Sequence, residues 1–199
     1  MLNRVLYVFA IIAGLSGLGT SSARAVTVDV FAQANSSSGG TGALTTVFLT
    51  LGQAFTVSAG LDDLWSAGAL PRWSNADGLT GDRFATGTDE SSEAPGTQIG
   101  TDFGIWSQNS FDAPYGSLVG QIGGGAFFLV GRNFSGTANT SGQLSLYYWD
   151  SNNDDNSGSI AATISASAVP GPIVGAGLPG LVMARAGLIA WRRRRMAAA

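Results

Sequence analysis

The residues best equipped for chemistry lie in one short segment, residues 150–159, which reads Asp-Ser-Asn-Asn-Asp-Asp-Asn-Ser-Gly-Ser. Ca²⁺ takes about six to eight oxygen ligands from carboxylates, amides and backbone carbonyls, and this segment offers all three. It is not an EF-hand, because Asp155 occupies the position that needs Gly and Ala161 the position that needs Glu. Asn and Asp also favour turns without any metal. The sequence therefore leaves two interpretations open, a calcium site and a solvated turn.

Two β-rich runs, residues 143–149 and 159–166, flank this segment, and we expect it to close a hairpin between them. Other short runs with strand patterning occur at residues 26–32, 43–51, 54–59, 102–106, 117–122 and 126–130. No part of this region sustains the helical period of about 3.6 residues. About eight antiparallel strands predict an all-β fold, a β-sandwich that occupies residues 26–167.

A long stretch between these runs, residues 60–101, carries no sustained strand pattern and is rich in Gly, Asp, Ser and Pro. Loops of this length are usually functional or disordered. Its most polar part, residues 87–96, is predicted to be a mobile surface loop.

The charge balance of the middle region restricts its partners. All 13 acidic residues of the chain lie between residues 26 and 167, where Arg72, Arg83 and Arg132 are the basic residues. So acidic a surface repels nucleic acid and attracts divalent cations. The chain has no Cys and no His, which excludes disulfides, Ser-His-Asp and Cys-His catalysis, and the commonest zinc ligand.

The N-terminal segment, residues 1–25, has the pattern of a secretory signal peptide. Arg4 provides a positive charge, residues 5–19 are apolar, and the small residues Ala23 and Ala25 form a cleavage site for signal peptidase. We therefore expect an exported protein that begins at Val26.

The C-terminal segment, residues 168–199, predicts a temporary membrane anchor. As a helix, residues 173–191 would span the roughly 30 Å of a bilayer core. A cluster of arginines that stops transfer follows on the cytoplasmic side, namely Arg192, Arg193, Arg194 and Arg195. Pro179 and Arg185 weaken the span, which suits a segment held briefly in the inner membrane and then cut. An ordinary C-terminal anchor is the alternative.

The start of this segment reads Val169, Pro170, Gly171 and Pro172, ahead of the apolar span and the arginine cluster. In this order the three features resemble the Val-Pro-Gly-Pro variant of the PEP-CTERM sorting signal. The resemblance implies that an exosortase recognises and cuts the chain near this motif. The protein would then pass to the cell surface or to the extracellular matrix, where exopolysaccharide is a potential partner.

A second resemblance concerns the middle region. Residues 116–123, 142–148, Asp150 and residues 155–159 resemble the soluble galactophilic bacterial lectins, small β-sandwich proteins in which Ca²⁺ bridges sugar hydroxyls. The resemblance implies that Asp150 contacts both metal and sugar, and that Asp155 and Asn156 are metal ligands.

The same resemblance implies two backbone carbonyl ligands, one near Asn153 and one from Ala67 in the turn at residues 64–68. The sugar would then contact Asp150, Ser151 and Asp155. Aromatic rings that could stack on its apolar face are Trp65, Trp73 and Trp106, each of which could equally lie in the core. The chain departs from the family by having no His, although these lectins use a His and a Gln from the middle loop against the sugar.

Three functions follow for this region. The first is an exported, surface-sorted, calcium-dependent carbohydrate-binding protein that engages extracellular polysaccharide. The second is a non-enzymatic structural protein of the envelope or extracellular matrix without a specific sugar site. The third, a glycoside hydrolase, needs two carboxylates about 5–10 Å apart across a cleft. Asp154 and Asp155 are instead neighbours in one segment, so we expect no enzymatic activity.

Overall fold

The computed structural model describes residues 24–168 together with Arg185, Leu188 and Met196. The predicted sorting helix (residues 173–191), apart from Arg185 and Leu188, and the predicted signal segment (residues 1–25), apart from Arg24 and Ala25, lie outside the described residues. Among the residues that are described, no helix is long and apolar enough to span a bilayer.

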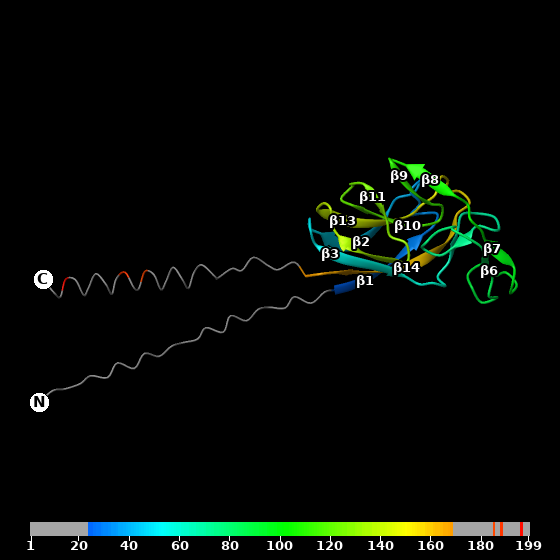
Figure 1. Ribbon diagram of the computed structural model, residues 1–199, viewed down its shortest axis with the longest axis horizontal. Coiled ribbons are helices and arrows are strands. Elements are labelled where there is room, and N and C mark those ends of the chain that lie inside the picture. The colour runs from blue at the N-terminus through cyan, green and yellow to red at the C-terminus, as the bar shows by residue number, and fades with distance from the viewer. Residues whose placement is uncertain (1–23, 169–184, 186–187, 189–195, 197–199) are drawn as a thin grey trace, which may run out of the picture.

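Residues 24–168 contain fourteen β-strands and no helix (Figure 1). The longer strands are β1 (Arg24–Phe31), β2 (Ala43–Leu49), β3 (Ala54–Ala59), β10 (Leu118–Ile122), β12 (Asn133–Thr137), β13 (Gly142–Tyr148) and β14 (Ser157–Ala166). The shorter ones are β4 (Trp65–Ser66), β5 (Trp73–Ser74), β6 (Arg83–Phe84), β7 (Gln98–Gly100), β8 (Ile105–Gln108), β9 (Phe111–Pro114) and β11 (Phe127–Leu129).

The strands form two main antiparallel sheets. One has six strands in the order β12-β3-β14-β4-β5, with β1 paired to the opposite edge of β14. The other has four strands in the order β11-β10-β13-β2. Two small pairs, β6–β7 and β8–β9, stand apart from them. The prediction of an all-β, antiparallel sandwich-like fold is therefore confirmed.

The core lies between the two sheets because each long strand turns alternate residues inward. In β2 and β13 buried positions alternate with exposed or half-buried ones, as expected for strands with one face against a core. The six-stranded sheet contributes residues such as Val30, Ile160 and Ile164, and the four-stranded sheet contributes Leu118 and Leu146. All five are at most 1% exposed.

The predicted strands are found close to their expected positions, with one shift and several omissions. The run expected at residues 102–106 forms β8 further along, at Ile105–Gln108. Residues 60–101 are not free of regular structure, since they contain β4, β5, β6 and β7. Strands of two or three residues are too short to display the period of two that identifies a strand in sequence.

The two ends of the described domain lie side by side. Arg24 pairs with Ala166 and Ala25 with Ser165 in the antiparallel register of β1 and β14. Both strands therefore leave the domain at the same end (Figure 1). The other end of β14, at Ser157, lies about 30 Å away at roughly 3.3 Å per residue.

Candidate functional site

The acidic segment at residues 150–156 connects the two sheets. It follows β13 in the four-stranded sheet and leads into β14 in the six-stranded sheet. The prediction that it closes a hairpin is therefore wrong. Both edges of β13 are already paired, with β10 and β2, and both edges of β14 are paired with β1 and with β3 and β4. Neither strand has a free edge for the other.

A second segment, residues 33–41, braces this connection from the side. Ser37 Oγ donates a hydrogen bond to the Asp150 carbonyl at 3.1 Å and accepts one from the Asp150 N–H at 3.2 Å. Gln33 Nε2 donates to the Asp154 carbonyl at 3.2 Å. No sequence pattern assigned this segment to the site, although its run of Ser and Gly at residues 36–40 is a turn signal.

Asp150 is held in the interior at the start of the acidic segment. The residue is 5% exposed, and its Oδ1 accepts a hydrogen bond from the Ser151 N–H at 2.6 Å. Burial raises the pKa of the Asp150 carboxyl, while hydrogen bonds from Ser151 and the Asn156 side chain oppose that rise. A carboxylate in such surroundings is stabilised by a cation.

Asn156 provides the clearest sign of a missing partner. It is 5% exposed, and its Nδ2 donates to the Ala32 carbonyl at 3.3 Å. Its Oδ1 has no hydrogen-bond partner among the described residues. Leaving a buried acceptor unpaired costs about 1–3 kcal/mol, so an orphaned amide oxygen next to a buried carboxylate fits a ligand or an ion.

The turn at residues 64–68 meets the acidic segment. β4 pairs with the first residues of β14, so that Ser66 lies opposite Ser157. Gly68, with a φ of +108°, approaches Asp155 so closely that a Cβ there would collide with Asp155 Oδ2. The structure thus brings the Ala67–Gly68 peptide next to the Asp155 carboxylate.

A cation of the chain itself lies at this junction. Arg72 Nη1 donates a hydrogen bond to the Ala67 carbonyl at 3.3 Å and lies 3.8 Å from Asp155 Oδ2. Its guanidinium carbon also sits 4.5 Å from the centre of the Phe103 ring. Arg72 was not among the predicted site residues, because an arginine in sequence gives no sign of which carboxylate it will meet.

The remaining predicted residues have different roles. The Asn153 carbonyl accepts a hydrogen bond from the Asn156 N–H at 3.4 Å, and the Asn153 side chain faces Gly39. Ser151 is exposed at the start of the segment. Trp65 is fully buried and donates from Nε1 to the Gly116 carbonyl at 2.8 Å, so it is a core residue. Trp106 is half-buried.

The donor set at this site consists of oxygen atoms of mixed type. Within residues 24–168 no group of three or more His, Cys, Asp or Glu side chains is arranged to hold a metal. The fit to Ca²⁺ therefore depends on two carboxylates, Asp150 and Asp155, with the orphaned Asn156 Oδ1 and nearby carbonyls such as that of Ala67. Oxygen donors of this mixed type suit a hard cation such as Ca²⁺.

The fold and this site define an antiparallel all-β protein with an oxygen-rich site where its two sheets are joined. No protein-family model matches the chain, and no curated protein matches it. Among solved structures it is similar to the EclA N-terminal domain, described as a PllA-like lectin. The two chains are 19% identical with a TM-score of 0.45, over 70% of this chain and 94% of that one.

Proposed function

We propose that this chain is an exported, calcium-dependent carbohydrate-binding protein of the lectin type, sorted to the cell surface or extracellular matrix. The observation that carries the proposal is the orphaned Oδ1 of Asn156 beside the buried carboxylate of Asp150. An unpaired buried acceptor and a desolvated carboxylate are each costly alone, and one cation would stabilise both. The sequence resemblance to the galactophilic lectins covers the same two residues.

In this proposal the residues of the site have two roles, binding the ion and contacting the sugar. Asp150, Asp155, Asn156 Oδ1 and the Ala67 carbonyl hold the ion, with the Asn153 carbonyl as a further candidate ligand. When bound, Ca²⁺ supplies open coordination positions for two neighbouring sugar hydroxyls. Asp150 and Asp155 also accept hydrogen bonds from those hydroxyls, and such charge-assisted bonds are stronger than neutral ones. Exposed Ser151 is available for a further polar contact.

The export part of the proposal agrees with the placement of the site. Because Val26, the expected first residue of the exported chain, pairs with Ile164, the two ends of the domain leave at one pole, and the acidic segment lies at the opposite end of β14. A tail that holds the first pole at a membrane would direct the acidic segment outward. Replacement of Pro170 by Ala in the producing cell should leave the protein in the inner-membrane fraction, as detected by immunoblotting. Unchanged delivery to the surface would contradict sorting through this motif.

Calorimetry tests the calcium part of the proposal directly. Titration of the purified protein with Ca²⁺ should release or absorb heat with a stoichiometry near one ion per chain. At a calcium concentration of about 100 times Kd, mass action should stabilise the folded state by about 2.7 kcal/mol and raise Tm by several degrees. A glycan panel titrated into the calcium-loaded protein then tests sugar binding. Absence of calcium heat at millimolar concentration would contradict the proposal.

A second candidate function is a structural protein of the envelope or matrix that lacks a specific sugar site. The observation in its favour is Arg72, which already neutralises part of the charge of Asp155 from within the chain. This function predicts no heat with any glycan, with or without calcium. Heat with calcium alone would therefore favour the structural function over the carbohydrate-binding one.

A further inference from the structure

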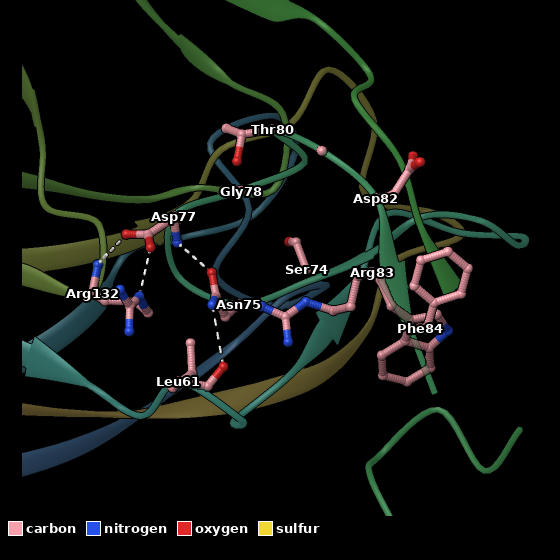
Figure 2. A pocket seen from close by; sticks show the side chains of 12 residues that line it. Leu61, Ser74, Asn75, Asp77, Gly78, Thr80, Asp82, Arg83, Phe84 and Arg132 are labelled. Carbon is pink, nitrogen blue, oxygen red and sulfur yellow. Dashed lines mark hydrogen bonds and ion pairs between the residues drawn. The ribbon is translucent and has the colours of Figure 1, made fainter. Parts of the chain in front are cut away.

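A cleft of about 560 Å³ lies away from the acidic segment, and none of residues 150–156 lines it. Its walls come from β5, β6, the loop between them, and Arg132 just ahead of β12 (Figure 2). Two of the three arginines in residues 26–168, Arg83 and Arg132, line this one cleft. We call it the arginine cleft. Two guanidinium groups lining one cavity are unexpected in so acidic a domain.

Arg132 is held in a fixed orientation with part of its hydrogen-bonding capacity unused. Its Nε donates to Asp77 Oδ2 at 2.6 Å, and its backbone N–H donates to Asp77 Oδ1 at 2.8 Å. Asp77 in turn is positioned by its N–H, which donates to Asn75 Oδ1 at 3.0 Å. Among the described residues, the two terminal nitrogens of Arg132 have no hydrogen-bond partner. A guanidinium anchored through Nε is preorganised to bind an anion through those nitrogens.

Arg83 has neither a side-chain hydrogen bond nor an ion pair among the described residues. The neighbouring carboxylate, Asp82, also lines the cleft but makes no ion pair with Arg83. Asp82 Oδ1 accepts hydrogen bonds from Gln98 Nε2 at 3.0 Å and from Thr101 Oγ1 at 3.2 Å. Figure 2 shows the Asp82 carboxylate pointing away from the Arg83 guanidinium, which extends into the cleft. Within the described part of the chain, Arg83 thus presents a guanidinium without a direct ion pair to a cleft that also holds the carboxylates of Asp77 and Asp82.

The rest of the lining fits a ring that carries hydroxyl groups. Phe84 is 56% exposed at the wall formed by β6, whereas Trp73 on β5 lines the cleft while packing half-buried against the cluster of Leu64, Ala85 and Ile99. Exposed aromatic faces stack on the apolar faces of pyranose rings. Exposed Thr80 has no hydrogen-bond partner for its hydroxyl among the described residues, and Figure 2 shows this side chain directed toward the cleft. An inorganic anion would use the arginines but would leave the aromatic wall and the hydroxyl without a partner.

We propose that the arginine cleft binds the carboxylate of an acidic sugar, a uronate unit, between Arg83 and Arg132. The sugar ring then lies against Phe84 and Trp73, and Thr80 contacts a ring hydroxyl. The choice of a sugar rests on the proposed function, whereas the choice of a carboxylate rests on the arginines alone. Binding here does not depend on calcium, because no donor of the acidic segment takes part.

The test uses the full chain in a buffer with a calcium chelator. Oligogalacturonate is titrated by calorimetry, and the same oligosaccharide with its carboxylates methyl-esterified is the matched ligand control. We expect the esterified oligosaccharide to bind at least tenfold more weakly, because it keeps the ring and hydroxyls and loses the charge. Binding of the acid form should also weaken as salt increases. Equal affinity for the two forms would overturn the proposal.

Variants separate the arginine cleft from the calcium site. Arg83→Gln should weaken oligogalacturonate binding at least tenfold, and Phe84→Ser should weaken it several-fold. Arg72→Gln, which removes an arginine outside the cleft, should leave the affinity for oligogalacturonate unchanged. If all three variants bind alike, or if equimolar inorganic phosphate displaces the oligosaccharide, the assignment to a uronate is wrong. Neutral-sugar binding in calcium is measured separately, and its loss in Asp150→Asn but not in Arg83→Gln distinguishes failure of one site from failure of the other.

Discussion

Nη1 of Arg72 lies 3.8 Å from Oδ2 of Asp155, where it also donates a hydrogen bond to the Ala67 carbonyl. Two groups that the sequence resemblance assigns to Ca²⁺ thus share a cation that belongs to the chain. Both side chains are partly exposed, 37% for Arg72 and 50% for Asp155, so their attraction is screened by water. A guanidinium held this weakly can be displaced by a divalent ion.

Replacement of Arg72 by Gln should therefore strengthen calcium binding. The variant removes a positive charge that competes for Asp155, and exposed ion pairs contribute about 1 kcal/mol or less. We expect Kd for Ca²⁺ to fall by up to about fivefold, measured by calorimetry. Arg83→Gln removes the same charge elsewhere and should leave this Kd unchanged. Weaker calcium binding in Arg72→Gln would mean that the arginine supports the site.

Replacement of Asp150 by Asn should uncouple calcium from stability. Because burial raises the pKa of Asp150 in the folded state, the metal-free protein loses the contribution of this group as pH rises through that pKa. An amide of the same shape carries no charge to desolvate. The metal-free variant should therefore unfold at a Tm equal to or above that of the native chain at pH 7. Calcium should no longer raise its Tm, and a calcium-induced rise of native size would remove Asp150 from the ligand set.

Replacement of Gly68 by Ala should damage the site through sterics. Gly68 has a φ of +108°, which costs other residues about 1–2 kcal/mol, and a Cβ there would also collide with Asp155 Oδ2. Gly52→Ala is the matched control, since Gly52 has a φ of +80° and nothing within 4 Å of an added Cβ. We expect both variants to lose stability in denaturant unfolding, and Gly68→Ala alone to lose calcium affinity. Equal calcium affinities would show that the approach of Gly68 to Asp155 has no role.

The long strands could be predicted from the sequence because one face of each is buried and apolar while the other is more exposed. Val47 and Leu49 in β2 face the core while Phe48 between them is 64% exposed, and the same alternation marks β13. The short strands were not predictable in this way. Trp65 and Ser66 are both buried, so β4 shows no alternation, and its place in the sheet depends on partners far along the chain.

The residue types of the site could be predicted from the sequence, but the way the segment connects the two sheets could not. Asp150, Asp155 and Asn156 follow one another within a few residues, so their common location follows from the chain alone. The hairpin expected around them is wrong, because sequence periodicity identifies strands without assigning them to sheets. The contacts made by Ser37 and Arg72 join segments that are distant in sequence, and no local pattern announces such contacts.

Asp89 in the polar loop between β6 and β7 provides a pH test that is independent of any ligand. Its Oδ2 accepts hydrogen bonds from the Thr86 N–H at 2.5 Å and from Thr86 Oγ1 at 2.9 Å, while Ser91 donates to Oδ1. The Ser91 hydroxyl, followed by the Thr86 N–H, lowers the pKa of Asp89 from 3.8 to about 2. A lowered pKa in the folded state means that this carboxylate stabilises the loop fully above about pH 4.

The Asp89 contribution should be lost between about pH 4 and pH 2, as the carboxylate becomes protonated. In an NMR titration we expect the Asp89 carboxyl carbon and the Thr86 amide to shift together with a midpoint near pH 2. Asp89→Asn should abolish the acid shift of the Thr86 amide. Because the loop is exposed, the variant should change Tm little at pH 7. A midpoint close to 3.8 would show that the loop is open in solution and that these hydrogen bonds do not hold it.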